Sequence, residues 1–450
     1  MRTTRLRTDK LNQPLDPSTA AELIALDKQH LWHPFTPMQQ WCAPEHETLI
    51  ITRGEGVWLW DQHGRKYIDG NSSIWTNIHG HQHPTITDAI KAQLDTLEHS
   101  SFLGFTNEPA IRLAAKLTSL FPENSLTRVF YSDNGSTAME CALKMAIQYW
   151  QLQGKPERCE FLAFDNAYHG DTLGAATLGG IGTFHGRFQH LGFRVHHIQN
   201  ADALFHIPDE MMGRIAGVAI EPGMQGAAGM KIWPEGTLKT VRQWCDWQET
   251  FLICDEVMTG FGRTGKMFAS EHEGVVPDFL ALSKGITGGY LPLGATLTTS
   301  KVYDAFLGRV EEMKTFYYGH SYCGNPLGCA AALASLQVFE QEETLAKLQG
   351  KISLMSELLA SLKTKHPKHV GEIRQLGFMA GIDLMADAPN NEAFPWQQLT
   401  GVNVCTAARK HGLLTRPVRD TIVLMPPLSI SHNELEMAVN AISAAIAGIS

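Results

Sequence analysis

FLICDEVMTGFGRTG, residues 251–265, and FLALSKG, residues 279–285, are the two stretches that decide the fold. Each opens with a short, nearly continuous apolar run, Phe251–Cys254 in the first and Phe279–Leu282 in the second. Such runs are typical of parallel strands that are covered on both faces. Each run is followed by charged residues, Asp255-Glu256 and Lys284. Because ligands of open α/β sheets bind at the carboxyl ends of the strands, these residues are candidates for one site.

The same pattern extends toward the N-terminus. Further apolar runs predict strands at Arg128–Tyr131, Phe161–Phe164 and Ala216–Ile220. Helical spacing predicts helices at Pro109–Leu120 and Ser136–Trp150. Strands that alternate with helices predict an α/β domain with a mostly parallel, doubly wound sheet.

The two ends of the chain differ from the middle and predict a smaller α+β domain. The expected elements are a helix at Thr19–His30, a hairpin over residues 57–68, one long helix at Leu336–Leu362, strands at Phe378–Leu384 and Thr421–Leu424, and a closing helix at Asn433–Ala447. A chain of 450 residues exceeds the size of one core. We therefore expect an N-terminal segment that contributes to the small domain (1–75), a large domain (76–338) and a C-terminal small domain (339–450).

The overall composition argues against several classes of protein. The hydrophobic fraction of 44% and charged fraction of 18% are typical of globular domains, and the net charge of -9 argues against nucleic-acid binding. No apolar run reaches the roughly 18 residues that span a membrane, and residues 1–16 lack the apolar core of a signal peptide. The eight cysteines contain no C-x-x-C pair, which predicts reduced thiols and a cytoplasmic protein.

Asp255 and Lys284 are the first candidate pair of site residues, and Glu221 stands at a third expected strand end. On spacing alone, a structural ion pair between Asp255 and Lys284 is an equally good interpretation. Gly285 and Gly288-Gly289 favour a binding site, because small residues let a flat ligand approach the backbone.

A second candidate is YSDNGSTA, residues 131–138, where a strand is expected to turn into a helix. Backbone N–H groups at the helix start and the hydroxyls of Ser136 and Thr137 would form a phosphate cradle. Taken alone, an ordinary helix cap explains the same residues. Tyr168 could stack on an aromatic ligand, although an aromatic residue at a strand end is more often part of the core.

Together these parts fit one cofactor, pyridoxal phosphate. This cofactor needs a lysine that carries it as a Schiff base, a carboxylate partner for its pyridine nitrogen, a phosphate site and a flat surface. These parts would be supplied, in the same order, by Lys284, by Asp255, by the residues around Ser136, and by Tyr168. The freed Lys284 amine would move a proton during transamination. The G-x-G-x-x-G fingerprint of a dinucleotide site is missing.

The string at 255–265, with Lys284 beyond it, resembles the signature of the class III aminotransferases, which are fold-type I pyridoxal-phosphate enzymes. Residues 30–36, 72–84, 131–140, 166–172 and 319–326 resemble the branch that converts 8-amino-7-oxononanoate to 7,8-diaminononanoate in biotin synthesis. The likeness runs from Leu26 to Ala445. Two alternatives remain: a class III aminotransferase for an ω-amino acid or a diamine, and a pyridoxal-phosphate-binding protein without turnover.

The resemblance implies roles for individual residues. Lys284 is expected to carry the cofactor and Asp255 to contact its pyridine nitrogen, while Gly135 and Ser136 bind the phosphate. Tyr168 is expected to stack on the ring and to contact the substrate. Lys284, Asp255 and Tyr168 are thus the expected catalytic residues.

Further implied roles concern the substrate and a second subunit. In the family, the stretch that corresponds to Gly319-His320-Ser321 reaches into the neighbouring subunit's site. We therefore expect a homodimer with shared sites, in which His320 and Ser321 bind the cofactor and Gly319 contacts substrate. Arg416 matches the arginine that receives the substrate carboxylate, a task that suits a bidentate guanidinium.

Phe35 and Ile74 depart from a common pattern of this branch. Many members have a tyrosine and a tryptophan there, which line the substrate site of enzymes that use S-adenosylmethionine as amino donor. Phe35, Ile74 and Trp75 are expected to bind substrate, and with residues 317–322 they resemble the subgroup that uses lysine. The expected donor is S-adenosylmethionine or lysine, and our hypothesis is that lysine is competent.

His79, His81 and His83 form a histidine cluster that also suggests a metal site. Zinc sites usually recruit carboxylate or thiolate ligands as well, and none lies nearby in the sequence. The resemblance places this segment beside the cofactor, so we expect no metal.

Overall fold

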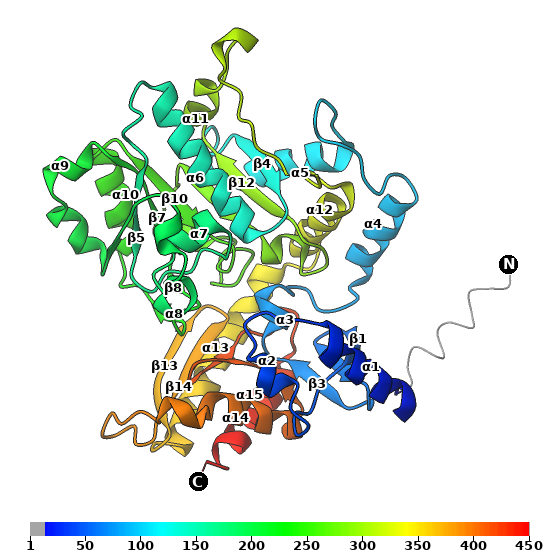
Figure 1. Ribbon diagram of the computed structural model, residues 1–450. Helices are drawn as coiled ribbons and strands as arrows, with labels where there is room; N and C mark the ends of the chain where they lie inside the picture. The colour runs from blue at the N-terminus through cyan, green and yellow to red at the C-terminus, as the bar shows by residue number, and fades with distance from the viewer. Residues whose placement is uncertain (1–13, 450) are drawn as a thin grey trace.

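The computed structural model describes residues 14–449, and its centre is a seven-stranded sheet (Figure 1). Neighbouring strands are parallel except for β12, which runs antiparallel to both of its neighbours. The strand order is β4 (Arg128–Ser132), β12 (Gly294–Thr298), β11 (Phe279–Leu282), β10 (Phe251–Asp255), β7 (Ile215–Ile220), β5 (Glu160–Phe164) and β6 (Val195–Ile198). The prediction of a mostly parallel α/β sheet is confirmed.

Successive residues of the central strands are buried in different cores. Phe251 and Ile253 of β10 belong to the same apolar cluster as helix α6 (Gly135–Leu152), whereas Leu252 and Cys254 belong to the other. The second cluster also receives helices α5 (Glu108–Thr118), α10 (Thr237–Trp247) and α12 (Pro326–Gln341). Burial on both faces explains why these strands are continuous apolar runs.

Two smaller sheets lie in the other half of the molecule, the lower part of Figure 1. One combines the predicted N-terminal hairpin with a strand from the end of the chain, in the order β1 (Ile51–Glu55), β2 (Trp58–Asp61), β3 (Lys66–Asp69) and β15 (Leu413–Leu414). The other has the order β13 (Val370–Leu376), β14 (Met379–Leu384), β17 (Thr421–Leu424) and β16 (Pro417–Val418). The boundaries at residues 75 and 338 stay a prediction.

The prediction of one helix over Leu336–Leu362 is wrong. The region contains α12, which begins ten residues earlier at Pro326, and a separate helix, α13 (Thr344–Lys365). Glu343 has a φ of +51°, a left-handed conformation that a right-handed helix cannot continue through. Both helices bury apolar side chains, so the sequence pattern runs on across the break.

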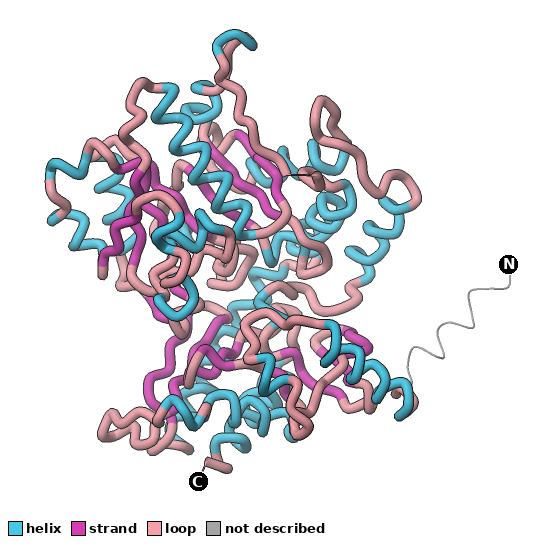
Figure 2. Tube along the Cα trace, viewed as in Figure 1, coloured by secondary structure: helices cyan, strands magenta, loops and turns pink. Residues whose placement is uncertain are grey.

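Helices at the two ends confirm the remaining expectations, with α1 at Pro17–His30 and α15 at His432–Ile446. Helix α14 (Thr400–Ala408) was not predicted. In the part of the chain that the structure describes, no helix is both long and apolar enough to cross a membrane. Most of the stretch 1–16, in which no signal peptide is expected, lies outside the described residues. Figure 2 shows how loops connect the helices and strands at the junction of the two halves.

Candidate active site

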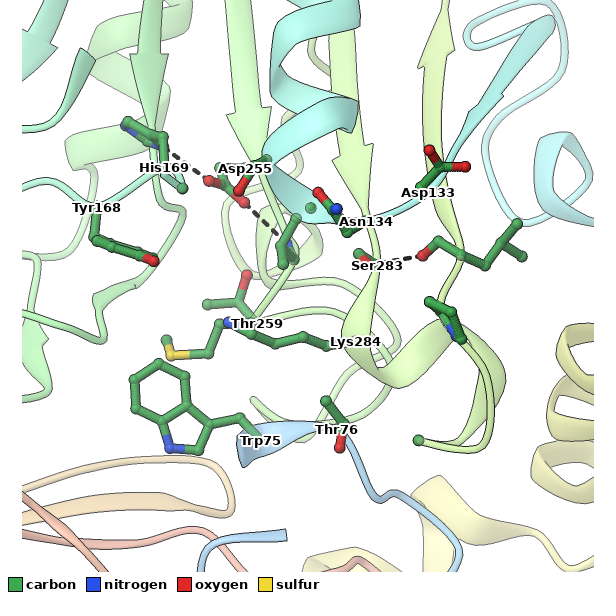
Figure 3. Close-up of a pocket in the computed structure, with 18 of the residues that line it drawn as sticks. Trp75, Thr76, Asp133, Asn134, Tyr168, His169, Asp255, Thr259, Ser283 and Lys284 are labelled. Carbon is green, nitrogen blue, oxygen red and sulfur yellow. Dashed lines mark hydrogen bonds and ion pairs between the residues drawn. The ribbon is translucent and has the colours of Figure 1, made fainter. Parts of the chain in front are cut away.

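A cavity of about 440 Å³ opens where β10 and β11 end and α6 begins (Figure 3). In the parallel register Asp255 lies opposite Ala281, so Lys284 follows three residues further along the neighbouring strand. The cavity gathers six of the residues predicted from the sequence: Trp75, Gly135, Ser136, Tyr168, Asp255 and Lys284.

Lys284 lies in the cavity with its amine unpaired. Among residues 14–449, no side chain or carbonyl group forms a hydrogen bond or an ion pair with its Nζ, which is 4.8 Å from the centroid of the Trp75 ring. Burial lowers the pKa of Lys284, although the negative charges of Asp255 and Glu221 oppose this shift. The lysine backbone has a φ of +42°, a strained conformation of the kind that clusters at functional sites. A desolvated lysine of this kind is an activated nucleophile.

Asp255 is held by two partners at the end of β10. Its Oδ1 accepts a hydrogen bond from the Val257 N–H at 3.1 Å, and its Oδ2 lies 2.8 Å from Nδ1 of the fully buried His169. Burial acts to lower the pKa of His169, but the hydrogen bond and charge of Asp255 outweigh it and raise that pKa. The carboxylate of Asp255 is thus joined to a buried histidine whose pKa it raises.

His169 was not predicted as a site residue. It lies next to Tyr168, but its role depends on a carboxylate 86 positions further along the chain. Periodicity and local spacing carry no information on such a contact.

Glu221 also lines the cavity, at the end of β7. Its carboxyl group accepts hydrogen bonds from the Tyr168 N–H at 3.1 Å and the Gly226 N–H at 3.2 Å. Burial raises its pKa to about 7. Glu256, in contrast, accepts hydrogen bonds from the backbone of Ala269 and Ser270 and is not among the residues that line the cavity.

The start of α6 is capped by Asn134 and Thr137, so the Thr137 hydroxyl, which was expected in the phosphate cradle, belongs to the cap instead. The Asn134 side chain accepts from the Thr137 N–H at 3.0 Å, and the Thr137 hydroxyl accepts from the Asn134 N–H at 3.0 Å. Gly135 and Ser136 line the cavity. The cap therefore leaves Gly135 and Ser136 free to face the cavity, so a capped helix and a phosphate site at its start are compatible.

Glycine is required where the backbone comes close to this cradle. A Cβ atom on Gly135 would lie 2.6 Å from Val257 Cγ1, and one on Gly170 would lie 2.1 Å from Ser136 Oγ. Two adjacent segments thus present bare backbone toward the start of α6.

Tyr168 forms one wall of the cavity, and its hydroxyl donates to Asp171 Oδ2 at 2.7 Å. Its ring stacks on His185, with the centroids 5.5 Å apart and an angle of 29° between the planes. Figure 3 shows Tyr168, Trp75, Asp255 and Lys284 around one space.

Other residues predicted from the sequence do not line this cavity, namely Phe35, Ile74, Gly319, His320, Ser321 and Arg416. Phe35 is 57% exposed, and its ring meets Phe184 edge-on at 5.3 Å; Phe184 in turn meets Tyr168 at 6.2 Å. Arg416 is exposed between β15 and β16, and Gly319 and Ser321 are exposed as well.

The three histidines of the possible metal cluster have separate partners. His79 pairs with Ser335 at 3.1 Å, His81 with Asp69 at 3.0 Å and His83 with Glu342 at 2.9 Å. Within residues 14–449, no group of three potential ligands has the geometry of a metal site.

These features meet the needs of pyridoxal phosphate. The cavity offers a buried amine without a partner, a carboxylate backed by a histidine, aromatic walls and a helix start with bare backbone. Each feature corresponds to one part of the cofactor: the aldehyde, the pyridine nitrogen, the ring and the phosphate.

Comparison with known proteins gives a consistent result. The model of the family described as aminotransferase class-III matches residues 41–446. The chain is similar to the adenosylmethionine-8-amino-7-oxononanoate aminotransferase of Geobacter sulfurreducens, with 48% identity over 93% of this chain and 96% of the relative. The enzyme of the same name from Aquifex aeolicus is also 48% identical, over 96% of this chain and 98% of the relative.

Solved structures agree. The adenosylmethionine-8-amino-7-oxononanoate aminotransferase of Methanocaldococcus jannaschii superposes with a TM-score of 0.92 and 42% identity, over 95% of this chain and 99% of that one. An amine transaminase from an uncultivated Pseudomonas species, solved in its PLP-bound form, gives a TM-score of 0.84 and 34% identity over 93% and 98% of the two chains.

Proposed function

The chain belongs to the class-III aminotransferase family, and from this premise we propose that it transfers an amino group to 8-amino-7-oxononanoate to form 7,8-diaminononanoate in biotin synthesis. It is a pyridoxal-phosphate-dependent aminotransferase of fold type I. The names of relatives that are 37–48% identical support the substrate. The observation that carries the proposal is the buried Lys284 amine in one cavity with the Asp255–His169 pair.

We propose that four groups hold the cofactor. Lys284 would bind it covalently through its amine, Asp255 would accept the N–H of the pyridine ring, and Tyr168 would pack on the ring. The backbone N–H groups at Gly135 and Ser136 would bind the phosphate at the positive end of the helix dipole. When bound, the cofactor supplies an electron-accepting ring for the carbon that loses its proton.

Proton transfer, the positioning of Asp255 and the exclusion of water would be the tasks of the protein's own side chains. The Lys284 amine would be the group placed to take a proton from the donor carbon and to deliver it to the neighbouring carbon of the cofactor. Its lowered pKa keeps a larger fraction of the amine neutral and able to act as a base. His169 would hold Asp255 in place through their 2.8 Å contact, and the Trp75 and Tyr168 rings would keep water from the reacting atoms.

For the amino donor, we propose that lysine serves as well as, or instead of, S-adenosylmethionine. Phe35 and Ile74 support this proposal because they replace the larger or more polar residues of many relatives. Purified protein that forms diaminononanoate with S-adenosylmethionine but none with lysine would rule it out. We also propose that Arg416 binds the carboxylate of the keto acid.

We further propose that the protein is a homodimer with shared sites. Ser321 is exposed in a segment rich in exposed aromatic residues, which include Tyr317 (74%) and Tyr322 (61%). Tyr322 packs on His99 at 4.7 Å, and the segment beyond His99 exposes Leu103 (78%). Apolar surface that gathers in this way is typical of subunit interfaces. Ser321 would contact the partner subunit's cofactor. His320 is the other residue expected there, but its ring nitrogens are paired within its own chain.

All eight cysteines of the chain lie in the described residues and are unpaired. Free thiols are the normal state in a reducing compartment, which supports our proposal that the protein is cytoplasmic.

The function is tested by incubating the purified protein with pyridoxal phosphate, 8-amino-7-oxononanoate and each amino donor, and measuring diaminononanoate by mass spectrometry. Other keto acids and ω-amino acids, tested in parallel, separate this function from that of another class III aminotransferase. Amination of those compounds alone would contradict the proposed substrate.

A further inference from the structure

Asp133 is an acidic side chain in the part of the cavity where we propose an anion. It immediately precedes the capping residue Asn134 and lines the cavity with Gly135 and Ser136 (Figure 3). An ionised carboxylate raises the free energy of a phosphate group in the same cavity, because like charges repel. The site therefore needs a group that compensates the charge of Asp133.

His320 is positioned to be that group. Its Nδ1 lies 3.0 Å from Asp133 Oδ2, and both side chains are only partly exposed. Its Nε2 lies 2.7 Å from the Tyr318 hydroxyl, and the two rings meet edge-on at 4.7 Å. Because both ring nitrogens have partners, His320 is fixed in orientation toward Asp133.

A lysine of α6 packs on the Tyr318 ring. The Lys144 ammonium group of α6 lies 4.3 Å from the centroid of the Tyr318 ring. Burial raises the pKa of Tyr318, so its hydroxyl stays neutral and available to His320. A chain of contacts thus begins in the cavity and ends on the side of α6. Its members are, in order, Asp133, His320, Tyr318 and Lys144.

We propose that His320 is a positioning residue for the phosphate subsite of its own chain: by pairing with Asp133 it compensates the carboxylate that would otherwise repel the cofactor phosphate. The inference rests on the proposed function, because it requires a phosphate at the start of α6. This role through Asp133 takes the place of the direct contact with the partner's cofactor that the family resemblance implies for His320, because both ring nitrogens are paired within its own chain.

The test compares two ligands that differ only in the phosphate. Apoprotein is titrated with pyridoxal phosphate and with pyridoxal, and binding is followed by absorbance and by quenching of tryptophan fluorescence. We expect H320A to bind pyridoxal phosphate about three- to fivefold more weakly, the upper part of the range for a partly exposed pair, and pyridoxal within about twofold of the wild type.

The double variant D133N/H320A separates charge compensation from damage to the loop. Removal of the carboxylate charge should restore the affinity for pyridoxal phosphate to within about twofold of the wild type. D133N alone should bind pyridoxal phosphate at least as tightly as the wild type does. H196A, which breaks a comparable pair between His196 and Glu160 at 2.6 Å on β6 and β5, is the matched control and should change neither affinity.

Several results would overturn the inference: equal weakening of both ligands by H320A, no weakening at all, failure of D133N to restore binding, or weaker binding by D133N alone. A direct contact of His320 with a cofactor predicts that D133N fails to restore binding. If the wild type binds neither ligand, the proposed function fails instead.

Discussion

At position 284 a lysine amine lies in a cavity with an indole ring and three carboxyl groups, and among residues 14–449 it has no hydrogen-bond partner. Two of these carboxyl groups, Asp255 and Glu221, act on the lysine through their negative charge. An unpaired buried amine is costly to the fold, and a protein tolerates it where the amine has a chemical task. The two carboxyl groups differ in their surroundings. Asp255 is paired with the side chain of His169, whereas Glu221 receives only backbone N–H groups.

Asp255→Asn tests the role of the first carboxyl group. The amide keeps the shape of the side chain but removes the charge that holds a proton on the pyridine nitrogen. We expect the variant to bind pyridoxal phosphate and to lose rate by a factor on the order of 100 or more. Single-turnover kinetics followed by absorbance measure this loss, and a near-normal rate would mean that another group tunes the ring.

Glu221→Gln tests the second carboxyl group through stability. Burial raises its pKa from 4.5 to about 7, so the folded state binds this proton more tightly than the unfolded chain. The stabilising contribution of protonated Glu221 is complete below about pH 4.5 and is lost as the pH rises through 7. Relative to E221Q, the wild-type apoprotein should lose about 2–3 kcal/mol of unfolding free energy between pH 4.5 and pH 8.

Denaturant unfolding of both proteins across this pH range measures the difference. A difference in unfolding free energy that stays constant with pH would show that Glu221 is ionised throughout.

At the scale of single elements, the start of α6 combines a structural and a binding function. Asn134→Ala removes the cap of an 18-residue helix and should cost about 1 kcal/mol of stability. Because the cap also fixes the N–H groups of Gly135 and Ser136, affinity for pyridoxal phosphate should fall more than affinity for pyridoxal. Thermal unfolding and ligand titration check the two effects, and a loss of stability with equal affinities would restrict Asn134 to capping.

The strands that build the site were predictable, whereas β12 and β6 of the same sheet were not. Fully buried parallel strands such as β10 and β11 are continuous apolar runs, which the sequence displays directly. β12 reads Gly-Ala-Thr-Leu-Thr and the edge strand β6 reads Val-His-His-Ile, so neither has that pattern. The break at Glu343 was missed because a single left-handed residue leaves the apolar spacing on both sides unchanged.

The site residues also divide into those that the sequence predicts and those that it does not. Lys284 and Asp255 stand at the ends of readable strands, so their meeting could be predicted. Glu221 likewise follows a readable strand. The contacts of His169 with Asp255 and of His320 with Asp133 join segments far apart in the sequence, and they exist only in the folded chain.

At the scale of the whole molecule, the N-terminal hairpin and the C-terminal strand β15 share one sheet. The site lies near the junction of this half with the large sheet, since Trp75 follows β3 and lines the cavity. The exposed aromatic residues around Tyr317 and Tyr322 lead us to expect a dimer in solution. Sedimentation equilibrium of the holoprotein should give twice the chain mass of 49.8 kDa, and a fully active monomer would contradict shared sites.

The central claim is that Lys284 carries the cofactor. The most direct measurement is borohydride reduction of the yellow holoprotein, followed by proteolysis and mass spectrometry of the labelled peptide. We predict a reduced pyridoxyl-phosphate group on Lys284 and none in Lys284→Ala, which should remain folded by circular dichroism but form no diaminononanoate. A label on another lysine, or turnover in the variant, would contradict the account.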